Sequence, residues 1–170
     1  MSDIAGQARL STGALYRYFR SKDDVFASLI ADLHEELFRS SRANGHSLTD
    51  RPYEALLEAN RGYLTVYQAN RDVMRSFVEA AAVDSRFRDI WWQMRQRHVD
   101  RFLAAVSRAS AAGAPGNGQL ALLADAMACM VEQSAYVWFA QEELRDRAPT
   151  VDEAARAVTD AWYRAFFAGP

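Results

Sequence analysis

Cysteine is nearly absent from this 170-residue chain, which carries only Cys129. A single thiol excludes an internal disulfide framework and is typical of a reducing compartment. Its neighbours Met127 and Met130 are apolar, so we interpret Cys129 as a small buried hydrophobe rather than a nucleophile. The chain shows no signal-peptide pattern, and no apolar run approaches the ~18 residues of a membrane span. We therefore expect a cytoplasmic protein without a membrane partner.

Motifs of catalysis and of metal binding are also missing. The three histidines, His34, His46 and His98, lie far apart in the sequence, and none belongs to a zinc-protease pattern. The chain has no nucleophile elbow, no phosphate-binding glycine loop and no pair of cysteines two residues apart. We therefore expect no enzyme activity, no cofactor and no metal, and keep an enzyme only as a remote alternative.

Lysine is nearly absent as well: Lys22 is the single lysine among 20 basic residues, and the others are arginines. The net charge of −2 and the pI of 5.9 argue against a protein that coats nucleic acid with its whole surface. Residues 1–22 differ, with a local charge of +3 from Arg9, Arg17, Arg20 and Lys22 against Asp3. A basic head on an acidic body is typical of a sequence-specific DNA binder with a separate regulatory domain. A chance run of arginines is the open alternative.

Strand-like alternation is not sustained anywhere, and apolar residues recur at three-to-four spacing along the chain, so we predict an all-α fold. Two short helices separated by a turn at Arg9–Ser11 predict a helix-turn-helix. A long helix follows from about Lys22 to Arg42 and links the head to the body. We divide the chain into a head with this linking helix, residues 1–44, and a larger helical body, residues 45–170. The predicted body helices begin near Pro52, Val73, Ser85, Gln119 and Thr150.

The densest local signals lie in Leu10–Lys22. Ser11-Thr12-Gly13 offers an N-cap hydroxyl and free backbone N–H groups, which suit an anion at a helix start. Leu15 and Phe19 are four residues apart and share an inward face, so tyrosines and arginines cover the rest of this short helix. The segment therefore presents an aromatic and cationic surface.

Two helix starts carry capping boxes in the sequence. Ser21 is followed three residues later by Asp24, and Thr150 by Glu153. Lys22 lies in the acidic first turn after Ser21, where a cation is locally unfavourable unless something outside the helix uses it. The alternative for Lys22 is a solvated surface residue.

The N-terminal string resembles the signature of the TetR family of bacterial transcriptional repressors. The matching residues are Ile4-Ala5, Ala8, Leu10-Ser11, Gly13, Leu15-Tyr16, Tyr18-Phe19 and Ser21-Lys22. An all-helical body of matching length extends the resemblance over the whole chain. The body is similar to the branch that contains the ethionamide-linked repressors, in the regions of Trp91, Pro149 and Trp162.

The resemblance implies a homodimer that binds operator DNA and pairs through its last two helices. In the family, the residues matching Ser11 to Ala14 open the recognition helix in the major groove, and the lysine matching Lys22 grips phosphate. Hydroxyls and tyrosines at a helix start suit such phosphate and base-edge contacts. The candidate DNA-binding residues are Ser11, Thr12, Gly13, Ala14, Tyr16, Arg17, Tyr18 and Lys22.

The resemblance also implies a pocket in the body for a small effector that releases the DNA. Few charges lie on the candidate faces, so we expect a largely apolar lipid-like, aromatic or acyl compound. Taken singly, each candidate is more often a packing residue than a ligand contact, and a buried Asn amide is more often satisfied within the protein. The candidate ligand-binding residues are Asn60, Tyr63, Phe77, Trp91, Met94, His98, Phe102, Met127, Val131 and Trp162.

Two departures from the family pattern bear on function. Arg9 stands in the turn where the family usually has glycine. The family's first helix, roughly 15 to 20 residues long, has no counterpart ahead of Ser2. We expect either that an N-terminal segment precedes the numbered chain or that the head is mobile and binds DNA weakly. A helical small-molecule-binding protein that has lost DNA binding is therefore the main alternative to a repressor.

Overall fold

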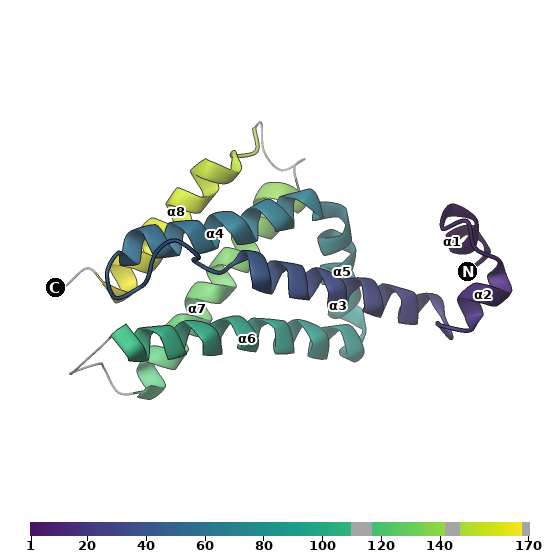
Figure 1. Cartoon of the computed structure of the whole chain (residues 1–170), viewed down its shortest axis with the longest axis horizontal. Helices are drawn as coiled ribbons and strands as arrows, with labels where there is room; N and C mark the ends of the chain where they lie inside the picture. Colours follow the sequence, from purple (N-terminus) through teal and green to yellow (C-terminus); the bar gives the residue numbers. More distant parts are fainter. Residues whose placement is uncertain (110–116, 142–146, 168–170) are drawn as a thin grey trace. The chain divides into compact units, whose positions relative to one another are not determined.

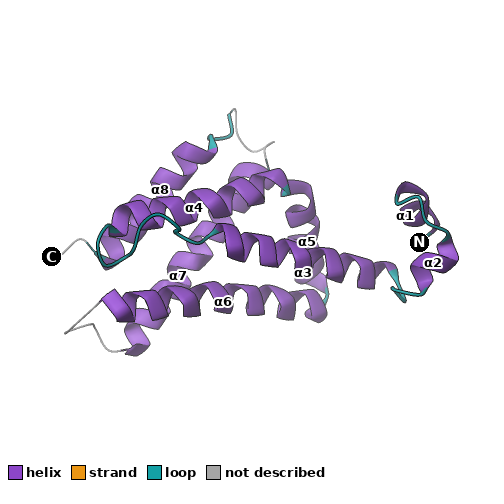
Figure 2. Cartoon of the chain, in the orientation of Figure 1, coloured by secondary structure: helices purple, strands orange, loops and turns teal. Residues whose placement is uncertain are grey.

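The computed structural model in Figure 1 describes residues 1–109, 117–141 and 147–167. These residues form helices and their connections, with no strand in the described ranges (Figure 2), so the predicted all-α fold is confirmed. The helices are α1 (Ser2–Gln7), α2 (Thr12–Tyr16), α3 (Lys22–Ser40), α4 (Pro52–Ala69), α5 (Arg71–Val83), α6 (Ser85–Ala109), α7 (Asn117–Ala135), the π-helix η1 (Tyr136–Ala140) and α8 (Val151–Phe166).

Contacts divide the chain into an N-terminal unit, Met1–Glu35, and a C-terminal unit, Glu36–Pro170. The boundary falls inside α3, so one continuous helix belongs to both units. The division into functional domains at residues 44 and 45 stays a prediction. Each unit is described by itself below.

The N-terminal unit has a small core under α1 and α2. Ala5 and Leu15 are buried, whereas the neighbouring Leu10 is exposed. The Ser11 hydroxyl accepts a hydrogen bond from the Ala14 backbone N–H at 3.1 Å, which confirms Ser11 as the cap of α2. Tyr16 ends the helix, one turn after it begins.

Arg9 holds a backbone conformation that favours glycine. Its φ of 55° is the only positive φ of a non-glycine residue in the described part of the chain. A side chain in this left-handed region costs about 1–2 kcal/mol. The turn between α1 and α2 therefore has the geometry of a glycine turn, although arginine occupies it.

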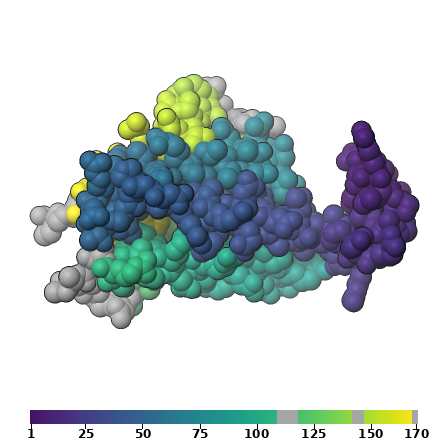
Figure 3. Space-filling view, in the orientation of Figure 1, coloured from purple at the N-terminus to yellow at the C-terminus, as the bar shows by residue number. Residues whose placement is uncertain are grey.

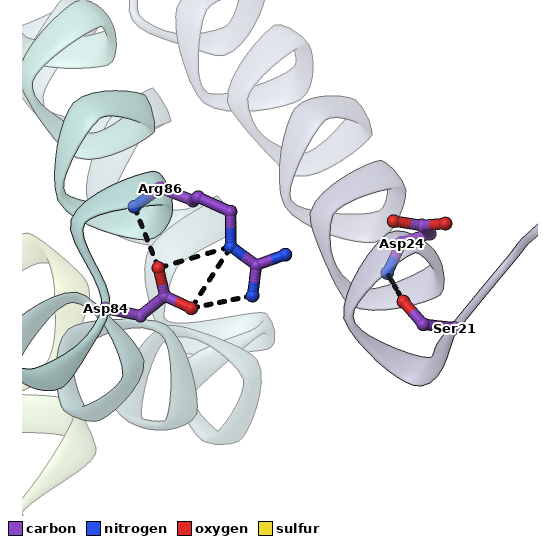
Figure 4. A network of polar contacts seen from close by, with 4 residues as sticks. All are labelled: Ser21, Asp24, Asp84 and Arg86. Carbon is purple, nitrogen blue, oxygen red and sulfur yellow. Dashed lines mark hydrogen bonds and ion pairs between the residues drawn. The ribbon is translucent and has the colours of Figure 1, made fainter.

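Two helix starts are capped by short polar side chains (Figure 4). At α3, the Ser21 hydroxyl accepts from the Asp24 N–H at 3.1 Å, while the Asp24 carboxylate accepts from the N–H of Arg20 at 2.9 Å. The second half of the predicted capping box is thus displaced by one residue. At α6, Asp84 accepts from the Arg86 N–H at 2.9 Å and pairs with its guanidinium at 2.7 Å.

Helices α4 and α8 lie side by side in the C-terminal unit (Figure 3). The Tyr53 hydroxyl donates to the Asp160 carboxylate at 2.8 Å, and Arg61 pairs with Asp152 at 2.7 Å. The capping box predicted at Thr150 is present in full at the start of α8. Helices α5, α6 and α7 pack next to one another and complete the unit.

Helix α7 carries more apolar surface than the described part of the chain covers. Together with η1 it forms a helix, Gly118–Ala140, that is long and apolar enough to cross a membrane by length and composition, with a mean hydropathy of 1.2. The expectation that no run approaches this length is therefore wrong. In the most apolar 18-residue window of this helix only 17% of the residues are buried, and Leu122 is 71% exposed.

The C-terminal end of α3 is held tightly within the C-terminal unit. A Cβ added to Gly62 of α4 would lie 1.9 Å from the Ser40 carbonyl oxygen, so only glycine permits this approach. On the other side, the Arg101 guanidinium donates to the Ser41 carbonyl at 2.8 Å and to the Phe38 carbonyl. These contacts satisfy carbonyl groups that a helix end leaves without partners.

We predict that Gly62→Ala destabilises the protein by about 1–3 kcal/mol or more, because the new methyl group overlaps backbone atoms of Ser40 that cannot move independently. Urea unfolding of the full chain measures the change. Gly118→Ala is the matched control, since a Cβ there meets no atom within 4 Å. Equal stability of Gly62→Ala and the unmodified chain would contradict the close approach.

Candidate nucleic-acid interface and ligand cavity

The predicted DNA-binding residues form an exposed surface of the N-terminal unit. Tyr16 and Tyr18 are 54% and 76% exposed, and Lys22, the first residue of α3, is exposed as well. Of the eight candidates only Ala14 is half-buried. Tyr18 lies in the turn after α2, where its backbone N–H donates to the Leu15 carbonyl at 3.1 Å. Tyr16 is therefore presented by the helix and Tyr18 by the turn that follows it.

A cavity of about 460 Å³ lies in the C-terminal unit. This volume is within the range of small-molecule sites, about 300–1,000 Å³. The cavity is lined by residues of α4, α6, α7 and α8 and by the segment that follows α3. Seven of the ten predicted ligand-binding residues line it, namely Asn60, Tyr63, Met94, His98, Phe102, Val131 and Trp162. Their contact with a ligand stays a prediction.

The other three candidates do not line this cavity. Phe77 and Trp91 line a separate cavity of only about 20 Å³, and Phe77 is fully buried as a core residue. Met127 lines neither of these two cavities. The cavity-facing stripe of α7 passes through Ala128, Val131 and Glu132, and one residue of an α-helix corresponds to a rotation of about 100°.

Asn60 has a structural partner in addition to its place at the cavity. Its side-chain amide donates to the Thr159 hydroxyl at 3.0 Å, and Thr159 is completely buried in α8. The satisfied amide, which is the commoner role of such a residue, is therefore present in the structure. Asn60 joins α4 to α8 beside the cavity.

The polar part of the cavity lining was missed by the sequence reasoning. It includes residues of the segment after α3 and basic side chains of α6, among them Arg42, His46, Arg101 and Arg108. Apolar periodicity gives no signal for such residues, because they follow a helix end or lie on exposed helix positions. The one partial signal was the helical spacing that puts Arg86, Arg97, Arg101 and Arg108 on one face of α6, which is equally typical of a solvated surface.

Glu132 is the acidic residue that lines the cavity, and it is already paired. Arg95 lies 2.6 Å from its carboxylate, and the Trp91 indole N–H donates to the same carboxylate at 3.0 Å. Burial raises the pKa of Glu132, while Arg95 and Trp91 oppose this shift. Trp91 thus helps to hold α6 against α7 through Glu132, and its predicted contact with a ligand stays a prediction.

His98 lies at the cavity in surroundings that disfavour its protonated form. Its ring meets those of Phe38 and Tyr63 edge to face at 5.3 and 5.7 Å, and its Nδ1 bonds to the Met94 carbonyl at 3.0 Å. Burial lowers the pKa of His98, and the positive charge of Arg101 lowers it further, while the bond to Met94 raises it.

Trp162 places an available donor at the cavity. The side chain is 8% exposed, and its indole N–H is buried without a hydrogen-bond partner among the described residues. The rings of Phe102 and Phe166 pack against it at 4.5 and 5.4 Å. A buried N–H without an acceptor destabilises the fold, and an acceptor oxygen of a ligand would satisfy it.

Metal binding finds no support in the described ranges, because they hold no group of three or more His, Cys, Asp or Glu side chains arranged to bind an ion. The absence of a metal and of a cofactor stays a prediction.

Two short helices joined by a tight turn, with hydroxyls, tyrosines and cations exposed, define a helix-turn-helix protein of the DNA-binding class. Residues 1–29 match the family model of bacterial regulatory proteins of the tetR family, so this segment is a TetR-type DNA-binding region. The predicted family is confirmed, and with it a role in transcription regulation. No curated protein matches the chain closely enough to count as a relative. The ethionamide-linked branch stays a prediction.

We predict that, because of His98, the free energy of unfolding decreases as the pH falls below about 6.5. The unfolded chain takes up a proton near the ordinary histidine pKa, while folded His98 stays neutral to lower pH, so the unfolded state binds more protons there. The stabilisation is complete above this pH and is lost as pH falls. Urea unfolding at pH 7.5 and 5.5 should show a smaller difference for His98→Gln. His46→Gln, at an exposed site, is the control, and an unchanged difference in His98→Gln contradicts the prediction.

Proposed function

We propose that this protein is a homodimeric transcriptional repressor that binds operator DNA and releases it when a largely apolar small molecule enters the cavity. The observation that carries the proposal is the position of the two ends of α3. This helix begins at Lys22, among the candidate DNA contacts, and the residues directly after its end line the cavity.

DNA binding is assigned to the N-terminal unit. The exposed hydroxyls of Ser11 and Thr12 and the small Gly13 at the start of α2 suit a close approach to base edges and phosphates. Tyr16, Tyr18 and Lys22 are free to position the unit on the phosphate backbone. Most of the affinity then comes from cations on phosphates, which makes binding sensitive to salt.

The effector acts on the end of α3. Ser41, Arg42 and Asn44 follow that helix and line the cavity, so a bound molecule changes the surroundings of the segment that fixes the helix. Release of DNA requires that the effector bind the non-binding arrangement more tightly than the binding one. In a dimer, this arrangement moves the two recognition helices away from the ~34–36 Å spacing of successive major grooves.

The effector is expected to be mainly apolar, because much of the cavity lining is apolar. Its apolar side chains include Met94, Val99, Phe102, Val131 and Trp162. Burial of such surface contributes about 25 cal/mol per Å². Nucleotides and sugars lack the apolar area that this lining offers.

The homodimer is proposed to form through α7 and α8. The low burial of Gly118–Ala140 and the exposure of Leu122 and Leu123 leave an apolar face that a second copy would cover. We assign the apolar character of this helix to dimer contact rather than to a bilayer, because a regulator of transcription acts on DNA. A cytoplasmic location follows from the same assignment.

We predict that effector lowers operator affinity. A gel-shift assay at stated salt, with DNA fragments selected by the protein from a random pool, should show at least a fivefold loss of affinity at saturating ligand. Retention of full affinity at saturating ligand would count against induction. Failure to select any DNA would favour the alternative of a ligand-binding protein that has lost DNA binding.

We predict that Lys22→Gln and Thr12→Val act differently on DNA binding. Loss of a phosphate contact at Lys22 weakens binding to all sequences alike and reduces the salt slope by about 1 per protomer. Loss of the Thr12 hydroxyl changes the preferred sequence, because it removes a group near base edges. Lys22→Arg keeps the charge and serves as the control. A change of preferred sequence in Lys22→Gln would reverse these roles.

A further inference from the structure

The charged residues that line the cavity are mostly positive. Arg42, Arg101 and Arg108 line it, whereas Glu132 is the one acid among the described lining residues. The Glu132 carboxylate is already paired with Arg95, which does not itself line the cavity. The three lining arginines therefore have no carboxylate partner within the described part of the protein.

Two of these arginines are gathered at one aromatic ring. The guanidinium carbon of Arg101 lies 4.1 Å from the centroid of Phe38, and that of Arg42 lies 5.6 Å from the same centroid. Arg97 lies over this ring as well, at 4.3 Å. Arg108 follows Arg101 by seven residues on α6, which places both on one face of the helix.

The charged form of Arg101 is disfavoured at this place, which is a cost to the fold. Burial, together with the smaller effect of the charges of Arg42 and Arg97, lowers the pKa of Arg101 to about 10. The bonds of Arg101 to the carbonyls of Phe38 and Ser41 offset part of this cost, since a helix C-terminus attracts a cation. This structural role accounts for Arg101 but leaves Arg42 and Arg108 without a function.

We propose that the effector is an amphipathic carboxylic acid, with its carboxylate among Arg42, Arg101 and Arg108 and its apolar body between Met94, Val131 and Trp162. Guanidinium groups bind carboxylates through paired, charge-assisted hydrogen bonds. The inference rests on the proposed function, because it assumes that the cavity holds the effector. It adds a charged head group to an effector described so far as largely apolar.

The position of the carboxylate also strengthens the link to α3. Arg42 follows the end of that helix, and Arg101 donates to the Phe38 carbonyl in its last turn and to the Ser41 carbonyl directly after it. An anion bound between these arginines competes for the same guanidinium that holds the helix end. Neutral ligands of equal size would fill the cavity without this competition.

Three ten-carbon probes test the head group: decanoate, decan-1-ol and decyltrimethylammonium. Isothermal titration calorimetry with the full chain should show decanoate binding about tenfold or more tightly than decan-1-ol and the cation binding least. The Arg42→Gln/Arg108→Gln double variant should lose about tenfold in decanoate affinity and keep its affinity for the alcohol. Both side chains are exposed and make no hydrogen bond that holds a helix end, so the variant tests charge with little change in packing. Arg88→Gln, at an exposed α6 site away from the cavity, is the matched control.

Each outcome is decisive. A preference for decanoate that disappears in the double variant but persists in Arg88→Gln supports the inference. Equal affinity for acid and alcohol, or an unchanged preference in the double variant, overturns the inference and leaves an apolar effector in place. Absence of binding by all three probes overturns the inference together with the proposed role of the cavity.

Discussion

The contact between Gly62 and the last turn of α3 is the constraint on which the proposed function depends. Because Gly62 has no side chain, the Ser40 carbonyl at the end of α3 packs directly against the backbone of α4. Arg101 holds the same end from α6. A helix that begins at the DNA-binding residues is thereby fixed at its far end, and the next residues line the cavity. Any coupling between ligand and DNA has a short physical route.

The cavity combines two kinds of lining that serve different purposes. Its apolar side chains give affinity without much selectivity, whereas buried or crowded polar groups discriminate between ligands because each unmade bond is costly. The unpartnered indole N–H of Trp162 and the crowded guanidinium of Arg101 are such groups. Glu132 is paired with Arg95, and His98 has a partner for Nδ1 in the Met94 carbonyl, while its buried Nε2 has none among the described residues.

Sequence reasoning identified the helices, the caps at Ser11 and Thr150 and five of the apolar residues that line the cavity. The candidates that do not line it have local explanations. Met127 and Val131 lie four residues apart, so spacing alone grouped them, but the choice of the cavity face of α7 depends on what packs against it. Trp91 is an aromatic residue of the kind that contacts ligands, but its indole N–H donates to Glu132, which lies 41 residues further along the chain on another helix.

By itself, the sequence determined the helical class, the helix-turn-helix and the family, since these depend on spacing, capping and turn residues that act within a few positions. It also marked Arg9 as unusual, and the φ of 55° gives the reason. Only the tertiary structure decided which side chains surround the cavity and that arginines gather at Phe38. These features arise from contacts between residues about 60 positions apart, whose distances no local pattern encodes.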